Sequence, residues 1–133
     1  MKANDLMVGD LVSRKGKPVR VLAINEGNGC CVSFGDGWCG EAVELLEPIP
    51  LTPEILEKNG FEREKLITLY NHFTGIDNRV SLHDDFMSMN SKNMWSVHID
   101  SEDYCTIASC ELTYVHELQH LLKLVKIDFN FVV

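Results

Sequence analysis

Residues 18–34 read PVRVLAINEGNGCCVSF, and this stretch decides how the first third of the chain folds. Between residues 18 and 25, one set of side chains, Val19, Val21 and Ala23, alternates with a second set, Arg20, Leu22 and Ile24. This two-residue period is that of a β-strand. Gly27-Asn28-Gly29 is a strong turn signal, and residues 30–34 can form the returning strand. The stretch therefore predicts an antiparallel hairpin.

Working outward from this hairpin, further short strands are expected on both sides. Residues 10–14 precede the turn Lys15-Gly16-Lys17, and residues 38–43 follow the turn Gly35-Asp36-Gly37. Residues 44–49 fit a fifth strand. Short strands separated by glycine-rich turns favour a small barrel, which protects its own sheet edges by closing them. We expect an SH3-like β-barrel as a first domain, residues 1–50.

The segment Pro48-Ile49-Pro50-Leu51 marks the predicted boundary, because two prolines hold the chain extended and lack amide donors. A short helix should follow. Thr52 is a good N-cap, Pro53 suits the first helical position, and Gly60 suits the left-handed residue that ends a helix.

The second domain, residues 51–133, is expected to be an α+β subdomain. Residues 61–80 fit either a helix or a strand. A helix is predicted at residues 114–125, with the apolar stripe Val115, Leu118, Leu122 and Val125. Strands are expected at residues 79–82, 95–99, 106–112 and 127–133. The predicted fold class is thus α+β, with the barrel followed by a small sheet that packs against one well-defined helix.

Composition limits the function classes. The chain of 133 residues has a net charge of −8. Its longest apolar runs are far shorter than the about 20 residues that a helix needs to cross a bilayer. With no signal-peptide pattern at its start, a cytoplasmic protein without a membrane association is expected. The only basic cluster is Arg14, Lys15, Lys17 and Arg20 around one turn, which we interpret as a solvated hairpin, so no nucleic-acid partner is expected.

The five cysteines follow no metal-ligand spacing and are odd in number, so buried free thiols are expected. Trp38 and Trp95 are expected in the core or at an interface. His83-Asp84-Asp85 is interpreted as a solvated loop, with half of a metal site or an acid–base pair as the less favoured interpretations.

One motif has the form of a catalytic site. His116-Glu117-Leu118-Gln119-His120 matches H-E-x-x-H on a predicted helix. Histidines four residues apart can share a zinc ion, and the glutamate can act as a general base toward a bound water. A zinc-dependent hydrolase with metal ligands His116 and His120 and catalytic Glu117 is therefore the alternative function.

The rest of the chain weakens that alternative. A catalytic zinc needs a third protein ligand, and Asp128 is the only candidate after the motif. Lys123 and Lys126 stand where the extended metzincin pattern requires glycine and histidine. His72, His83, His98 or a carboxylate could act from upstream, but the spacing selects none. We expect no metal, no cofactor and no catalytic residue, and we expect His116 and His120 to flank the apolar stripe, at the surface or hydrogen-bonded locally.

Three short motifs resemble a known family. They are the opening Met1-Lys2-Ala3-Asn4-Asp5-Leu6 with Val8-Gly9-Asp10, the junction Pro48-Ile49-Pro50-Leu51-Thr52 with Gly60-Phe61, and Tyr114-Val115-His116 with Leu118-Gln119 and Leu121. Together they are similar to small uncharacterised proteins of gut Bacteroides-type bacteria and their phages or prophages. The resemblance implies no activity. It implies glutamine at the position of Glu117 and asparagine at that of His120, so that the zinc motif arose here by drift on a structural helix.

The sequence thus predicts a non-enzymatic binding or accessory module of phage or prophage origin. Its partner is expected to be another protein or a second copy of the chain, and no pattern identifies the binding residues.

Overall fold

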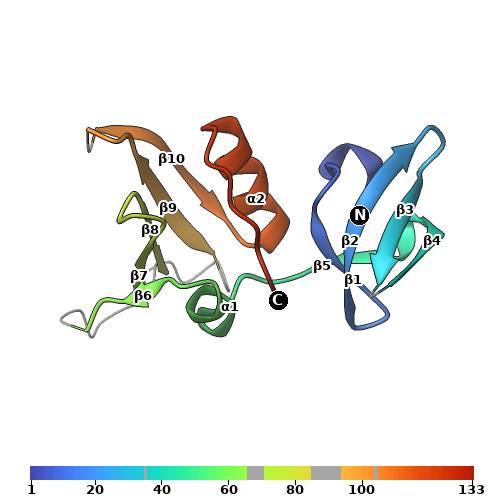
Figure 1. Cartoon of the computed structure of the whole chain (residues 1–133), viewed down its shortest axis with the longest axis horizontal. Coiled ribbons are helices and arrows are strands. Elements are labelled where there is room, and N and C mark those ends of the chain that lie inside the picture. Colours follow the sequence, from blue (N-terminus) through green and yellow to red (C-terminus); the bar gives the residue numbers. More distant parts are fainter. Residues whose placement is uncertain (35, 66–70, 85–93, 104) are drawn as a thin grey trace.

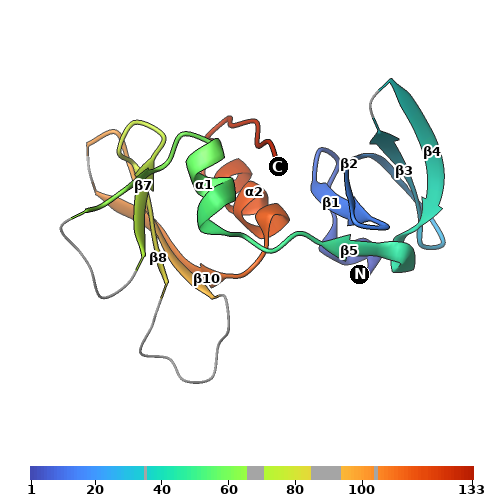
Figure 2. The same ribbon diagram turned by 90° about the horizontal axis from the view of Figure 1, so that it is seen from below.

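The computed structural model describes residues 1–34, 36–65, 71–84, 94–103 and 105–133. In these residues the protein is α+β, with two five-stranded antiparallel sheets and one main helix (Figure 1). The two sheets are separate in space, and Figure 2 shows helices α1 (Pro53–Lys58) and α2 (Val115–Leu124) on the side of the second sheet that faces the first.

The first sheet, which we call the N-terminal sheet, has the strand order β4-β3-β2-β1-β5. Its strands are β1 (Leu11–Arg14), β2 (Lys17–Asn25), β3 (Gly29–Phe34), β4 (Gly37–Ala42) and β5 (Leu46–Pro48). The hairpin predicted from residues 18–34 is confirmed, with Val21 paired to Val32 and Asn25 to Gly29. Its core consists of eight buried residues: Leu6, Val12, Val19, Val21, Cys30, Val32, Val43 and Leu46.

Two short 3-10 helices flank these strands. The first, η1 (Ala3–Asp5), precedes β1, and the second, η2 (Val43–Leu45), joins β4 to β5. The prediction of one strand over residues 44–49 is therefore wrong at its start, because the chain turns through η2 before pairing Leu46 with Arg14 of β1.

The second sheet, which we call the C-terminal sheet, has the order β10-β9-β8-β7-β6. Its strands are β6 (Glu62–Arg63), β7 (His72–Gly75), β8 (Val80–Asp84), β9 (Trp95–Asp100) and β10 (Thr106–Leu112). The ambiguous residues 61–80 thus include β6, β7 and the start of β8, and part of that range lies outside the described residues. In β9 the buried residues Trp95, Val97 and Ile99 alternate with partly exposed ones, so one face of the sheet packs against the helices.

Both predicted helices are confirmed. Thr52 caps α1 by accepting a hydrogen bond from the Ile55 amide (3.3 Å), and Gly60 follows with a positive φ of 80°. In α2 the predicted stripe is fully buried at Val115 and Leu118, nearly so at Leu122, and partly at Val125.

The predicted final strand, residues 127–133, is wrong. This segment is irregular, and its Ile127 and Phe131 are buried in the cluster beneath the C-terminal sheet. The backbone of Val132 is bonded by a side chain and not by a neighbouring strand. Asn59 accepts a hydrogen bond from the Val132 amide (2.9 Å) and donates one to the Val132 carbonyl (2.7 Å). The alternating apolar pattern therefore reflects side-chain burial without strand pairing.

The cysteines and tryptophans follow the predictions only in part. Cys30 is buried and Cys31 and Cys39 are partly so, but Cys105 and Cys110 are exposed, so the expectation of buried thiols is wrong for these two. Trp95 is a core residue whose indole N–H donates to the Leu51 carbonyl (2.8 Å). A core position is wrong for Trp38, which lies on the edge strand β4 and is 70% exposed.

Helix α2 has ten residues. None of the helices in the described parts of the chain has the length and apolarity needed to cross a membrane.

Candidate functional site

The H-E-x-x-H motif occupies the first two turns of α2, and its glutamate caps the helix. Glu117 Oε2 accepts hydrogen bonds from the backbone amides of Thr113 (2.7 Å) and Tyr114 (2.9 Å). Tyr114 is the N-cap residue, whose amide has no intrahelical partner, and Thr113 precedes it; a negative charge is favoured at this end by the helix dipole. Glu117 therefore has a structural use, and the carboxylate oxygen that makes both bonds is already occupied.

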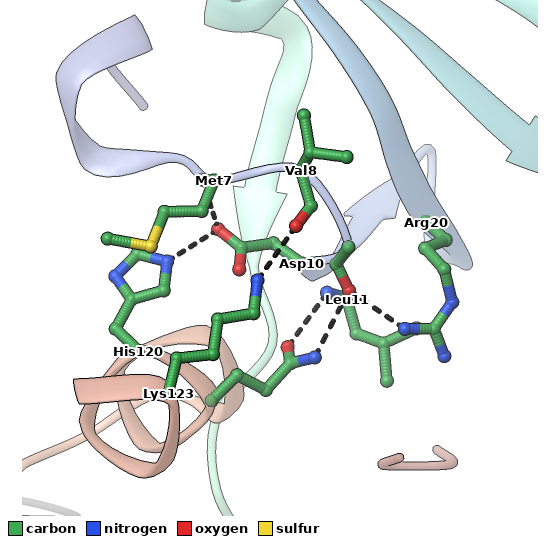
Figure 3. A network of polar contacts seen from close by, with 9 residues as sticks. Met7, Val8, Asp10, Leu11, Arg20, His120 and Lys123 are labelled. Carbon is green, nitrogen blue, oxygen red and sulfur yellow. Dashed lines mark hydrogen bonds and ion pairs between the residues drawn. The ribbon is translucent and has the colours of Figure 1, made fainter. Parts of the chain in front are cut away.

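His120 contacts a buried carboxylate from the other end of the chain. Its Nε2 lies 2.7 Å from Oδ2 of Asp10, and the Asp10 side chain has no exposed surface (Figure 3). The same oxygen accepts a hydrogen bond from the Met7 amide (2.7 Å). The expectation that His120 lies at the surface or bonds locally is wrong, since its partner is 110 residues away and the two are brought together only by the fold.

His116 is also buried, at 5% exposure, so the surface alternative of the expectation is wrong for this residue. Its ring lies parallel to that of Tyr114 (centroids 5.8 Å apart) and edge-on to that of His120 (5.6 Å). Burial lowers the pKa of its imidazole, while the charges of Asp10 and Glu117 act in the opposite direction. Among the described residues, neither its buried Nδ1 nor Oδ1 of Asp10 has a hydrogen-bond partner.

Two further side chains of α2 bind the same loop, residues 7–11. Gln119 accepts a hydrogen bond from the Leu11 amide (2.9 Å) and donates one to the Gly9 carbonyl (3.2 Å), as Figure 3 shows. Lys123 donates to the Val8 carbonyl (2.8 Å). We call these contacts, together with the pair of His120 and Asp10, the interlobe clamp, where each lobe is one of the two sheets with the segments that pack on it. It joins the polar side of α2 to the loop that leads into β1.

Arg20 of β2 also binds the loop of residues 7–11. Its guanidinium donates to the Gly9 carbonyl (2.8 Å) and to the Phe131 carbonyl (3.2 Å), so it links the loop to the C-terminal segment. The loop can approach because Gly9 adopts a φ of 97°, which a side chain would strain.

Sequence reasoning missed Asp10, Gln119 and Arg20 as members of this network. Asp10 precedes a strand and resembles an ordinary turn residue, so only its burial and its distant partner reveal its role. Val8-Gly9-Asp10 and Leu118-Gln119 are both among the short motifs on which the resemblance in the sequence analysis was based. Nothing in the sequence, however, indicates that these two motifs contact each other.

A cavity of about 320 Å³ opens beside the motif. It is lined by residues from both ends of the chain and from the junction: Met1, Asp5, Pro48, Tyr114, His116, Glu117 and His120. Within the described ranges, however, no three histidine, cysteine or acidic side chains form a group that could hold a metal ion. The cavity is thus a feature of the junction between the two sheets, with imidazole and carboxylate groups in its wall.

The upstream histidines lie elsewhere, together on the C-terminal sheet. His72 is paired with His83 across β7 and β8, with ring centroids 6.3 Å apart, and the rings of His83 and His98 are stacked at 5.6 Å. The neighbouring Asp84 accepts hydrogen bonds from both the backbone and the side chain of Asn71, at 2.6 Å each. The prediction of a loop is therefore wrong for His83 and Asp84, which lie in β8, and Asp85 lies outside the described residues. The fold brings these three histidines to each other and not to His116 and His120.

Comparison with protein-family models, with curated proteins and with solved structures finds no match to this chain.

Proposed function

We propose that this chain is a non-enzymatic binding or accessory module, in which the H-E-x-x-H helix is a structural element. The observation that carries the proposal is the use of the motif's own polar groups. Glu117 caps its helix through Oε2, and His120 is bonded to the buried Asp10. A zinc hydrolase would need both rings directed at one metal and the glutamate directed at the attacking water, whereas Nε2 of His120 is directed at Asp10 and Oε2 of Glu117 at two backbone amides.

A zinc-dependent hydrolase using His116, Glu117 and His120 is the competing function. It is favoured by one observation, the cavity of about 320 Å³ whose wall contains all three residues. Against it stands the same geometry that supports the structural role, because Nε2 of His120 is bonded to Asp10, which leaves only Nδ1 of that ring for a metal, and Oε2 of Glu117 is occupied by two backbone amides.

We further propose that the N-terminal sheet is an SH3-like barrel. Strands β4 and β5 are joined through η2, yet they occupy opposite ends of the sheet order, which supports a rolled sheet. An ion pair between Arg14 of β1 and Glu41 of β4 also supports it, since these strands are not neighbours in the sheet.

The partner is proposed to be a protein and not a nucleic acid. The chain has a net charge of −8, and two members of its only basic cluster are already engaged, Arg14 with Glu41 and Arg20 with two backbone carbonyls. Exposed aromatic residues on β3 and β4, Phe34 and Trp38, offer the kind of surface that protein partners use. A cytoplasmic location and a phage or prophage origin remain part of this proposal.

The two functions are separated by a hydrolysis experiment. The full chain, purified without chelators, is supplied with zinc and assayed on unstructured peptide and simple ester substrates, alongside Glu117→Gln and the exposed control Glu44→Gln. The proposal expects no zinc-dependent turnover in any of the three proteins. Zinc-dependent turnover that is lost in Glu117→Gln and kept in Glu44→Gln, with both variants folded by circular dichroism, would establish the hydrolase.

A further inference from the structure

The cavity beside the H-E-x-x-H motif has a wall that favours a cationic ligand. Asp5 of η1 and Glu117 of α2 contribute two carboxylates, and Tyr114 and His116 contribute two rings. The described residues that line this cavity include no lysine or arginine. Its volume of about 320 Å³ lies near the lower end of the about 300–1,000 Å³ that ligand pockets span, so it suits a small group.

Both carboxylates of the wall keep an oxygen that can bind a ligand. Glu117 makes its two bonds to the backbone through Oε2. Asp5 accepts a hydrogen bond from the Lys2 amide through Oδ2 (3.0 Å). In the part of the chain that the structure describes, Oε1 of Glu117 and Oδ1 of Asp5 make no such bond. Two acceptors with negative charge are therefore available at this cavity.

His116 gives an independent indication of a missing partner. It belongs to the wall and is 5% exposed, and within the described ranges its buried Nδ1 has no hydrogen-bond partner. Such an atom in a folded protein calls for a ligand or an ordered water. Burial lowers the pKa of this imidazole, so the ring is neutral at neutral pH and can accept a hydrogen bond. The charges of Asp10, Glu117 and Asp5 act on the ring against that of His120, and they favour a cation beside it.

We propose that this cavity binds a guanidinium group, either of a free small molecule or of an arginine side chain of a partner. This inference rests on the proposed role as a binding module and names a ligand class for it. A guanidinium presents five N–H donors in one plane, so it can reach acceptors that lie apart, such as the carboxylates of Glu117 and Asp5. A metal ion requires ligands that converge, and among the described residues no three acidic, histidine or cysteine side chains do so.

The rings of the wall favour a guanidinium over an ammonium group. The rings of Tyr114 and His116 are nearly parallel, at 13°, with centroids 5.8 Å apart. A guanidinium is planar, stacks on aromatic rings and is more weakly hydrated than an ammonium group, so it loses less when it leaves water. Arginine is therefore expected to bind better than lysine.

The test uses Nα-acetyl-arginine amide and methylguanidine as probes, with the citrulline and lysine counterparts of the first as controls. Binding to the full chain is followed by the NMR signals of its backbone amides, with a chelator present. We expect saturable shifts at Asp5 and at residues 114–120 that weaken as salt is added. The citrulline compound has nearly the same shape without the charge and should cause none. Binding of methylguanidine would show that a free guanidinium suffices, whereas binding of the arginine amide alone would indicate an arginine of a partner.

Two variants test the assigned carboxylates. Asp5→Asn and Glu117→Gln each remove one charge but keep an acceptor oxygen for the backbone bonds. Each should weaken binding by about two- to fivefold, which is the worth of one partly exposed ion pair. The control Glu26→Gln removes the same charge from the exposed turn between β2 and β3 and should bind like the wild type. Circular dichroism checks that all three variants are folded.

Three results would each overturn the proposal. They are the absence of saturable shifts, equal binding of the citrulline or lysine compound, and unchanged binding in both Asp5→Asn and Glu117→Gln. Hydrolysis is measured separately and with zinc, so a failure of guanidinium binding and a failure of the non-enzymatic role give different results.

Discussion

The two sheets have the same number of strands but differ in where their cores come from. All buried residues of the N-terminal cluster fall between Leu6 and Leu46, so this core is closed within one stretch of sequence. The C-terminal cluster has twice as many members and includes Leu11 of β1, together with residues as distant as Phe131. Leu11 thus makes an apolar contact between the two parts of the molecule, beside the polar contacts of the interlobe clamp. Helix α2 contributes its apolar side to the C-terminal cluster and its polar side to the clamp.

Helix α2 combines core packing on one side with a polar side that carries the catalytic-looking motif, and we propose that both sides serve the fold. Val115, Leu118 and Leu122 bury the apolar side, while His120 and Gln119 bond to the loop before β1. The predictions that follow separate these two sides of α2.

The largest effect is expected on the apolar side. Leu118 has no exposed surface, so Leu118→Ala should lower the free energy of unfolding by about 2–5 kcal/mol through lost burial and the cavity left behind. Denaturant unfolding measures this. Leu124→Ala is the matched control, since Leu124 lies in the same helix but is 75% exposed, and equal costs for the two variants would contradict the assigned packing.

The next effect is expected in the clamp. Asp10→Ala removes the acceptor for both the Met7 amide and His120, and a buried group left without its partner costs about 1–3 kcal/mol. Unfolding curves measure the loss, with the exposed Asp36→Ala as control. If Asp10→Ala proves as stable as the control, the clamp does not contribute to the fold.

The clamp also shows how far the sequence could predict this molecule. The hairpin of residues 18–34, the cap at Thr52 and the stripe of α2 depend on neighbours in sequence, and they were predicted. The pair of Asp10 and His120 joins residues 110 positions apart, and no local pattern contains that information. The prediction of a strand at residues 127–133 was wrong for a related reason. The alternation of Ile127, Phe129 and Phe131 indicates which side chains are buried, but it does not indicate whether another strand is available to pair with this segment.

A smaller effect is expected at the start of α2. Glu117→Ala removes the acceptor for the Thr113 and Tyr114 amides and should cost about 0.5–2 kcal/mol, as lost helix caps do. Glu117→Gln keeps an acceptor oxygen and should recover part of that stability. A Glu117→Ala variant as stable as the wild type would show that the carboxylate is free for another use.

The smallest effect is expected from pH. Burial lowers the pKa of His116 below its ordinary 6.5, so the unfolded chain takes up a proton at this residue before the folded one does. Stability from this residue is therefore present above about pH 6.5 and is lost as the pH falls below it. Chemical denaturation at a series of pH values should show this loss, and His116→Gln should reduce it. An equal pH dependence in both proteins would contradict the assignment.

The central claim is that the H-E-x-x-H helix serves the fold and binds no catalytic zinc. Thermal unfolding of the full chain with and without excess zinc tests it most directly, because a metal bound only to the folded state raises the unfolding temperature. The account predicts no zinc-dependent rise that depends on the motif, and a lower unfolding temperature for His120→Ala in the presence and absence of the metal. A zinc-dependent rise in the wild type that disappears in His120→Ala would contradict it.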